Sequence, residues 1–184
     1  AVHRPPVDPH VRLNRIVSKW LSANGLEVTV DEVVPTKWEK LGNLVLLPVD
    51  WGGDGVAETL QAHRNAETLW RAMAEALNAE ALGVQAPIAN DTFRSSQVRM
   101  LLGSPHVRFV DHGITFAFDA SKVMFSSGNI TERRRIGALD MSGETVVDAY
   151  AGVGYYAFPM LIHSGAARVP VSYTHLTLPT TSPV

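Results

Sequence analysis

The most constraining feature of the sequence is the stretch from Val146 to Tyr155, which reads VVDAYAGVGY. Two β-branched residues precede an aspartate, a turn of small residues with two glycines follows, and the next segment is apolar. This order is typical of the strand, loop and helix that open a nucleotide-binding α/β sheet. Glycines let a ligand approach the backbone, and the N-terminus of the helix offers unpaired N–H groups. The stretch therefore predicts an α/β fold with a ligand-binding loop.

The aspartate at the predicted strand tip, Asp148, indicates which ligand this loop would bind. Its carboxylate suits the amino group of S-adenosylmethionine, whereas a dinucleotide fold would place another glycine there. The third glycine of the dinucleotide fingerprint is also absent, because Ala157 occupies its position. We therefore expect S-adenosylmethionine, with a dinucleotide-dependent oxidoreductase as an alternative. Because two glycines also occur in ordinary tight turns, the prediction needs a second motif.

That second motif is the segment FSSGNITERRR, which runs from Phe125 to Arg135. A polar loop containing Gly128 opens a predicted helix from Asn129 to Met141, whose first turns carry one acid and three arginines. Arginine can pair with a carboxylate or a phosphate in a forked geometry, so a ligand contact is one interpretation. A solvated charge run on an exposed helix is the other. The position just before the glycine loop favours the ligand contact.

Together the two motifs resemble the tRNA wybutosine-synthesizing protein 2 family of aminocarboxypropyltransferases. The resemblance covers roughly Lys37 to Val169 and includes the segment KWEKLGNLVLLP that ends at Pro48. It implies a substrate-facing α+β region ahead of a Rossmann-like domain of the class I methyltransferase type, which binds S-adenosylmethionine. It also implies transfer of the donor's 3-amino-3-carboxypropyl group to the tricyclic guanosine derivative beside the anticodon of phenylalanine tRNA.

Two alternatives to this function stay open. The tRNA guanine N1-methyltransferases resemble the same family in architecture and cofactor, but they typically carry an arginine at the position of Gly128 and a proline at that of Tyr155. These two residues favour aminocarboxypropyl transfer over methyl transfer. The second alternative is a catalytically silent RNA-binding fragment that uses the α+β region and the arginines. A formal net charge of −2 makes it less attractive.

The resemblance also implies individual site residues. Arg133 is suited to the donor's carboxylate, and Glu132 is the candidate general base that removes a proton from the acceptor. The alternative for Glu132 is a helix N-terminal acid that interacts with the helix dipole. No metal ligands are expected. The predicted cofactor contacts are Ser126, Arg133, Asp148, Ala151, Gly152 and Gly154.

Other polar residues near these motifs receive weaker predictions. Arg134 and Arg135 would face either RNA phosphate or solvent. His163 is expected to be a packed or surface helix residue without a catalytic role. Asp119 ends a predicted strand and would at most orient the loop at Ser126.

The N-terminal half shows local patterns for several further elements. Apolar residues at helical spacing predict a helix from Pro9 to Asn24, and a second, longer helix from Glu58 to Leu82 with an apolar stripe. A strand is expected from Asn43 to Pro48 and a loop from Gly83 to Ser96. Three short strands, close in sequence, predict an antiparallel sheet packed on the long helix. Their expected bounds are Gln97–Leu102, Val107–Asp111 and Ile114–Asp119.

These patterns divide the chain into four parts. The expected parts are an N-terminal helical segment at 1–36, the α+β substrate-facing and tRNA-facing region at 37–125, the start of the donor-binding domain at 126–169, and a tail at 170–184. The tail begins with Pro170, contains no acid, and resembles the translation of a library adapter, so we expect it to be non-native. A single βα unit cannot bury both faces of its strand. We therefore expect exposed apolar surface around 146–149 and no transferase activity from this chain alone.

Composition limits the class of protein. With 46% hydrophobic and 18% charged residues, the chain is ordinary for a globular domain. It contains no cysteine, which excludes disulfides and thiolate metal sites within these residues. No apolar run approaches the roughly 20 residues that span a bilayer. The first nine residues lack the apolar core of a signal peptide, so a cytoplasmic location is expected.

Overall fold

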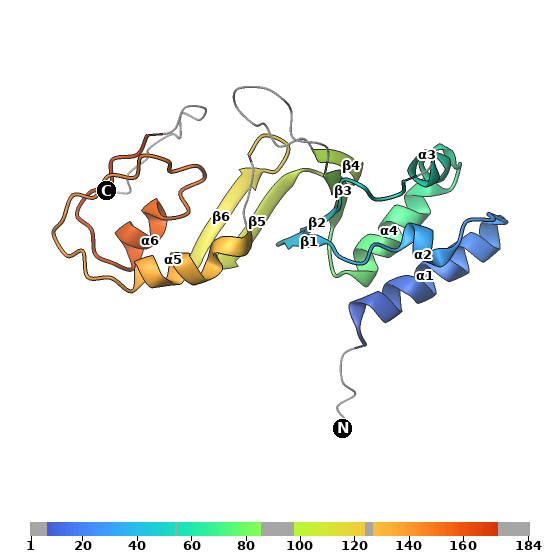
Figure 1. Cartoon of the computed structure of the whole chain (residues 1–184), viewed down its shortest axis with the longest axis horizontal. Helices are drawn as coiled ribbons and strands as arrows, with labels where there is room; N and C mark the ends of the chain where they lie inside the picture. Colours follow the sequence, from blue (N-terminus) through green and yellow to red (C-terminus); the bar gives the residue numbers. More distant parts are fainter. Residues whose placement is uncertain (1–6, 54, 86–97, 124–126, 173–184) are drawn as a thin grey trace.

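The computed structural model describes residues 7–53, 55–85, 98–123 and 127–172. The molecule is elongated, with four helices and a sheet at the N-terminal end, a β-hairpin in the middle and two helices at the C-terminal end (Figure 1). This mixed α/β architecture agrees with the predicted fold class.

The first helix shows how local sequence signals set its limits. Helix α1 (Pro9–Asn24) begins after Asp8, whose carboxylate accepts a hydrogen bond from the N–H of His10 at 2.7 Å. It ends at Gly25, which takes the left-handed conformation with φ 64°. The predicted bounds of this helix are confirmed. Its inward face buries Leu13, Val17 and Leu21. The short helix α2 (Val30–Val33) follows, with Thr29 and Glu32 forming a capping box.

A four-stranded sheet forms the centre of the N-terminal end. Its strands are β1 (Glu39–Leu41), β2 (Leu44–Leu47), β3 (Ala81–Gln85) and β4 (Val98–Leu102), in the order β1-β2-β3-β4. Strands β2 and β3 are parallel, while both outer pairs are antiparallel. The predicted strand from Asn43 to Pro48 is therefore confirmed as β2. Every residue of β2 is buried, as expected for a central strand covered on both faces.

The long helix predicted from Glu58 to Leu82 is wrong. The segment instead contains α3 (Val56–Ala62), α4 (Ala66–Ala76) and the start of β3. Asn78 takes a positive φ of 52° just after α4, which turns the chain into the strand. A short apolar run such as the one in β3 has no periodicity that separates a buried strand from a buried helix.

Part of the predicted apolar stripe is nevertheless correct, because Leu69, Trp70, Met73 and Leu77 are all buried. Ala81 is buried as well, but in β3 rather than on the helix. The loop expected from Gly83 to Ser96 starts too early for the same reason: β3 continues to Gln85. Residues 86–96 of that expected loop lie outside the described part.

A separate hairpin joins β5 (His106–Asp111) to β6 (Ile114–Asp119). Its two turn residues, His112 and Gly113, both have positive φ, at 48° and 78°, as a two-residue type I′ turn requires. The three short strands are thus confirmed, but their predicted arrangement as one antiparallel sheet on the long helix is wrong. Strand β4 pairs with β3, whereas β5 and β6 pair only with each other among the described residues.

The hairpin is attached to the four-stranded sheet through the β1–β2 turn. The side-chain amide of Asn43 donates to the carbonyl of His106 at 3.3 Å and accepts from the N–H of Arg108 at 3.1 Å. A second apolar cluster, distinct from the main core around α1 and α4, also lies between hairpin and sheet. Its buried members are Leu41, Leu44, Leu46, Ala81, Val107 and Ala120.

The C-terminal end carries the predicted strand, loop and helix in reduced form. A 3₁₀ turn (Ser127–Asn129) leads into α5 (Ile130–Gly137), which is shorter than the predicted helix, and α6 (Ala157–Ile162) follows the glycine loop. The expected first strand is represented by two isolated parallel bridges, from Thr145 to Arg168 and from Asp148 to Val171.

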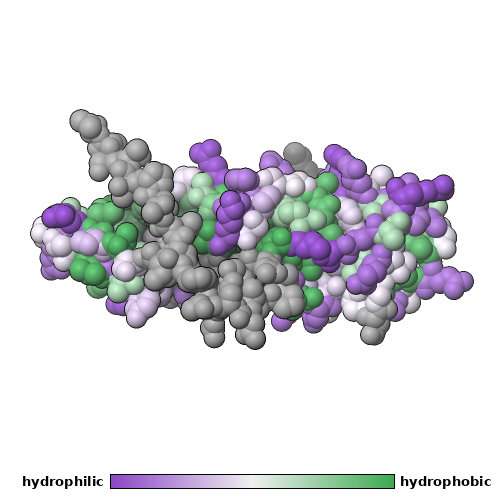
Figure 2. Space-filling view, turned by 90° about the horizontal axis from the view of Figure 1, so that it is seen from above, coloured by the Kyte–Doolittle hydropathy of each residue, from purple (hydrophilic) through white to green (hydrophobic). Residues whose placement is uncertain are grey.

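Apolar side chains are exposed at this end of the molecule. Val147 is 68% exposed and Tyr150 is 91% exposed, which confirms the apolar surface predicted around 146–149. Figure 2 shows hydrophobic residues reaching the surface at the C-terminal end, beside the hydrophilic ones. A surface of this kind is typical of a face that another part of a fold or a partner covers. None of the helices in the described ranges is long and apolar enough to cross a membrane.

Candidate functional site

The glycine loop is built on the parallel bridges that precede it. The N–H of Asp148 donates to the carbonyl of Pro170 at 3.0 Å, and the carbonyl of Asp148 accepts from the N–H of Ser172 at 2.9 Å. The chain then turns, and the N–H of Gly154 donates to the carbonyl of the buried Ala151 at 2.8 Å. Both backbone groups of Asp148 are therefore bonded to one neighbouring segment, residues 170–172, and the loop follows directly after Asp148.

Both glycines of the loop have left-handed conformations that favour glycine. Gly152 has φ 54° and Gly154 has φ 85°. A Cβ atom at Gly154 would lie 2.4 Å from the ring of Phe158, on the first turns of α6. At Gly152 the nearest atom to such a Cβ would be 3.9 Å away, in the Tyr155 ring. Glycine is thus needed at position 154 for its left-handed backbone conformation and for its close contact with Phe158. At position 152 it is needed for the left-handed conformation alone.

Asp148 presents a buried carboxylate to this loop. The residue is 8% exposed, and its Oδ1 accepts a hydrogen bond from the N–H of Tyr150 at 3.1 Å. Its Oδ2 is buried without a hydrogen-bond partner in the described part of the chain. Since a buried carboxylate oxygen without a partner is costly, this atom suits a ligand that supplies N–H or O–H donors. The observation supports the predicted role of Asp148 as a ligand contact.

Arg133 is the most deeply buried charged residue of the described part. It lies on α5, is 3% exposed, and its Nε donates to Oδ2 of Asp111 at 2.8 Å. Its guanidinium carbon also lies 5.3 Å from the ring centroid of Tyr155, the residue after the second glycine. Arg133, which belongs to the second sequence motif, therefore lies between the hairpin and the glycine loop of the first motif.

Asp111, which neither sequence motif includes, contacts the predicted site residue Arg133. It ends β5, twenty-two positions before Arg133, and no motif links the two residues. The available signal was weak: an acid directly before a His-Gly turn at the end of a strand. Only the packing of the hairpin on α5 brings this carboxylate to the arginine.

Glu132 points its carboxylate at a neighbour on its own helix. Its two oxygens accept from Nε and Nη2 of Arg135, at 2.9 and 2.7 Å. Hydrogen bonding to Arg135 lowers the pKa of Glu132, against a smaller opposing effect of burial. A carboxylate with a lowered pKa is a weaker base. The general-base role and the helix-terminus role of Glu132 both stay predictions. Arg135 is engaged in this pair, and Arg134 is exposed.

The segment before α5 is only partly described. Ser126, a predicted cofactor contact, lies outside the described residues. The turn that leads to it begins at Asp119, whose Oδ1 accepts from the N–H of Ser121 at 2.9 Å and from its hydroxyl at 2.5 Å. Burial raises the pKa of Asp119, but the bonds from Ser121 and the charge of Lys122 outweigh it, so the pKa is lowered overall. Asp119 therefore shapes the turn that precedes the loop.

His163 fixes the tip of the hairpin against the end of α6. Its ring stacks on that of His112 with centroids 4.6 Å apart, and its Nε2 lies 2.8 Å from the carbonyl of His112. This packing agrees with the structural role expected for His163. A small pocket lies between hairpin, α5 and α6, and Asp111, Arg133 and His163 help to line it. No group of three potential metal ligands occurs within the described ranges.

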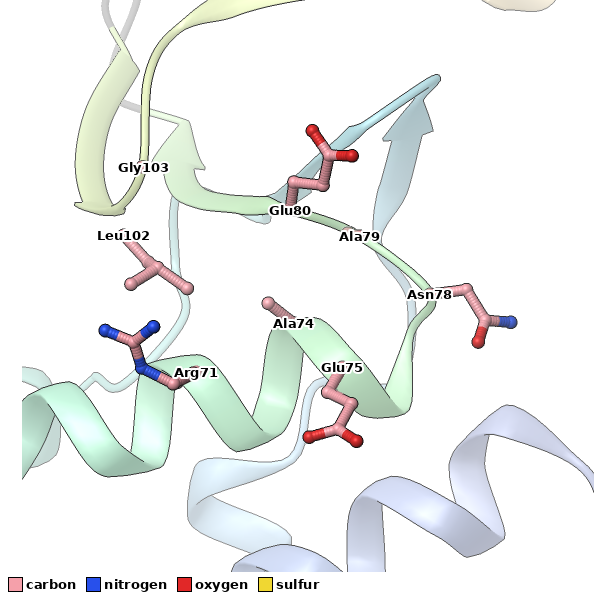
Figure 3. Close-up of a pocket in the computed structure, with 8 residues that line it drawn as sticks. All are labelled: Arg71, Ala74, Glu75, Asn78, Ala79, Glu80, Leu102 and Gly103. Carbon is pink, nitrogen blue, oxygen red and sulfur yellow. The ribbon is translucent and has the colours of Figure 1, made fainter.

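A larger, open pocket lies at the other end of the molecule (Figure 3). It is lined by α4, by residues 78–80 between α4 and β3, and by the end of β4, and none of the predicted site residues takes part. Arg71, at its edge, is paired with Glu67 at 2.6 Å. In Figure 3 the side chains of Glu75 and Asn78 point away from its centre. The predicted site residues therefore do not belong to this pocket.

Comparison with solved structures finds the same fold in TYW2 and Trm5 proteins. The structure of P. horikoshii TYW2 in complex with MeSAdo has a TM-score of 0.60 at 24% identity, over 86% of this chain and 52% of that one. The complex of aTrm5 with tRNALeu has a TM-score of 0.63 at 19% identity, over 92% of this chain and 47% of that one. At these identities the likeness shows the fold alone.

Sequence comparison identifies the family. Residues 17–106 match the TYW2 N-terminal domain, and residues 108–173 match the TRM5/TYW2 methyltransferase domain. The Danio rerio tRNA wybutosine-synthesizing protein 2 homolog is 39% identical over 163 residues, which are 87% of this chain and 39% of that protein. The chain belongs to the tRNA wybutosine-synthesizing protein 2 family. It spans about two fifths of the length of this curated relative.

Proposed function

We propose that the chain forms part of an enzyme that transfers the 3-amino-3-carboxypropyl group of S-adenosylmethionine to tRNA. The acceptor is the tricyclic wybutosine precursor beside the anticodon of phenylalanine tRNA. Family membership supports this function, and so does the P. horikoshii relative crystallised with MeSAdo. The observation that carries the proposal is the buried Oδ2 of Asp148, which has no partner among the described residues and lies at the mouth of the glycine loop.

The transfer requires a particular orientation of the donor. The acceptor attacks the methylene carbon attached to the sulfonium sulfur, the carbon–sulfur bond breaks, and methylthioadenosine leaves as a neutral thioether while the acceptor releases a proton. Methyl transfer would need the methyl carbon in line instead, so the way the donor is held decides which bond breaks. The site must therefore fix the amino-acid arm as well as the adenosine.

The described residues provide groups for both ends of the donor. Asp148 would accept hydrogen bonds from the donor's polar groups, while Ala151, Gly152 and Gly154 would let it approach the backbone. Arg133 would hold the donor's carboxylate, because a guanidinium pairs with carboxylates in a fixed forked geometry. Ser126 completes the proposed set of contacts. Methylthioadenosine leaves as a neutral molecule and needs no acid to protonate it. Catalysis would therefore rest on positioning and electrostatics.

The proposed division of labour along the chain keeps residues 37–125 on the tRNA side and residues 126–169 on the donor side. The hairpin contacts both the four-stranded sheet and the α5–α6 end, so it would join the two sides. The aTrm5 structure with tRNALeu shows that this fold occurs in a tRNA-bound protein. A cytoplasmic location and a non-native origin of residues 170–184 stay predictions.

A product assay tests the function directly. The full-length product of the gene would be incubated with S-adenosylmethionine and phenylalanine tRNA that carries the tricyclic precursor. We expect methylthioadenosine as the released product and a tRNA mass increase that matches an aminocarboxypropyl group. S-adenosylhomocysteine with a methylated guanosine would instead identify a guanine N1-methyltransferase. Salt-sensitive tRNA binding without either product would identify a silent RNA-binding protein.

A further inference from the structure

We propose that Asp111 positions Arg133, so that the β5–β6 hairpin sets the orientation of the donor's amino-acid arm. Asp111 belongs to the region, residues 37–125, that is proposed above to lie on the tRNA side, and it would act through Arg133 without touching the donor. This inference deepens the proposed function and rests on it, because it requires Arg133 to hold the donor's carboxylate.

The contact between the two residues is buried and well formed. The side chain of Arg133 is 3% exposed and that of Asp111 is 12% exposed, with Nε and Oδ2 2.8 Å apart. A buried guanidinium is stable only when it is paired and hydrogen-bonded. Because Asp111 accepts from Nε, it fixes the plane of the guanidinium and thereby the direction of its remaining N–H donors. The Tyr155 ring, 5.3 Å from the guanidinium carbon, limits movement on another side.

The hairpin that carries Asp111 is packed against the C-terminal end at several residues. The I′ turn follows directly, and His112 in this turn stacks on His163 at 4.6 Å. On β6, the ring of Phe116 meets Phe158 at 5.9 Å and Tyr155 at 6.4 Å between centroids. The hairpin thus contacts α6 and the glycine loop at several points around the ion pair. A shift of the hairpin would carry Asp111, and with it Arg133, relative to the loop.

This arrangement predicts a selective defect when Asp111 is changed. S-adenosylmethionine has the carboxylate that Arg133 would hold, whereas methylthioadenosine keeps the adenosine and the methyl-bearing sulfur, now a neutral thioether, without the amino-acid arm. A misplaced Arg133 would therefore weaken binding of the first ligand and leave the second unaffected. General damage to the fold would weaken both ligands equally.

The experiment measures the affinity of both ligands for the full-length gene product by isothermal titration calorimetry. Asp111→Asn removes the charge but keeps an acceptor for Nε, and Asp111→Glu keeps the charge but moves it by one methylene. We expect S-adenosylmethionine affinity to fall roughly tenfold or more in Asp111→Asn, the usual effect of losing a charged hydrogen bond. Asp111→Glu should lose less, and methylthioadenosine affinity should stay within about twofold in both variants.

Asp140→Asn provides the matched control. This exposed carboxylate follows α5 and pairs with Ser142, whose N–H donates to it at 3.0 Å, so its loss should leave both affinities unchanged. Equal weakening of both ligands in Asp111→Asn, or no weakening of either, would overturn the positioning role. Failure of the unmodified protein to bind S-adenosylmethionine is a different result, because it would remove the proposed function itself.

Discussion

Replacing Gly154 by alanine should loosen helix α6 in a way that the structure allows to be estimated. The backbone at Gly154 has φ 85°, and an alanine held in a left-handed conformation costs about 1–2 kcal/mol. The added Cβ would also lie 2.4 Å from the Phe158 ring. That ring is 36% exposed and can swing away, but it then loses its contact with Phe116, worth about 0.5–1.5 kcal/mol. The two effects together give roughly 1.5–3.5 kcal/mol.

Hydrogen exchange measured by mass spectrometry on peptides that cover α6 is the suitable assay. The amides of Phe158, Met160 and His163 donate to carbonyls within this segment, so their protection reports its opening. A loss of about 2 kcal/mol corresponds to roughly 30-fold faster exchange. Tryptophan fluorescence would be a poor probe here, because all 4 tryptophans precede residue 71.

Gly152→Ala separates the two causes. It has φ 54° and a Cβ there would meet only Tyr155, at 3.9 Å, so only the conformational part of about 1–2 kcal/mol applies. In a Phe158→Ala background, Gly154→Ala should cost no more than Gly152→Ala does. Equal effects of the two glycine substitutions in the unmodified background would refute the predicted clash with Phe158.

Two other predictions concern stability. Leu47→Ala, at a fully buried position of β2, should lower the free energy of unfolding by about 2–5 kcal/mol in urea titrations followed by tryptophan fluorescence; a loss below about 1 kcal/mol would contradict a packed core there. Pairing with Arg135 lowers the pKa of Glu132 in the folded protein. The ion pair therefore stabilises the fold fully above the pKa of an unfolded glutamate, about 4.3, and this stabilisation is lost as the pH falls through the lower pKa of the folded state. Glu132→Gln should remove this part of the acid-induced loss of thermal stability, and identical pH profiles would contradict the pairing.

Local sequence signals were sufficient to predict those helices and turns whose ends are determined by their own residues. Asp8 and Gly25 define α1, and the His112-Gly113 turn defines the hairpin, because capping and positive φ depend on nearby backbone geometry. The order of bridge, glycine loop and helix around Gly154 was likewise predictable, since it follows from a motif whose glycines have a physical purpose.

The sequence could not show which distant segments pack together. From the sequence alone, β3 looks like the end of the preceding helix, because its continuous apolar run shows neither the helical nor the strand periodicity. Its parallel pairing with β2 makes it a strand. The pairing of β4 with β3 instead of β5 has the same origin. Asp111 was missed at the site because its ion pair with Arg133 depends on the docking of the hairpin, which no local pattern encodes.

The most direct test of the donor site is a crystal structure of the full-length gene product with S-adenosylmethionine bound. We predict that the donor lies against Gly152 and Gly154, that Oδ2 of Asp148 accepts a hydrogen bond from it, and that its carboxylate contacts the guanidinium of Arg133. A donor bound elsewhere, or one whose carboxylate points away from Arg133 while Asp148 stays unengaged, would contradict the proposed site.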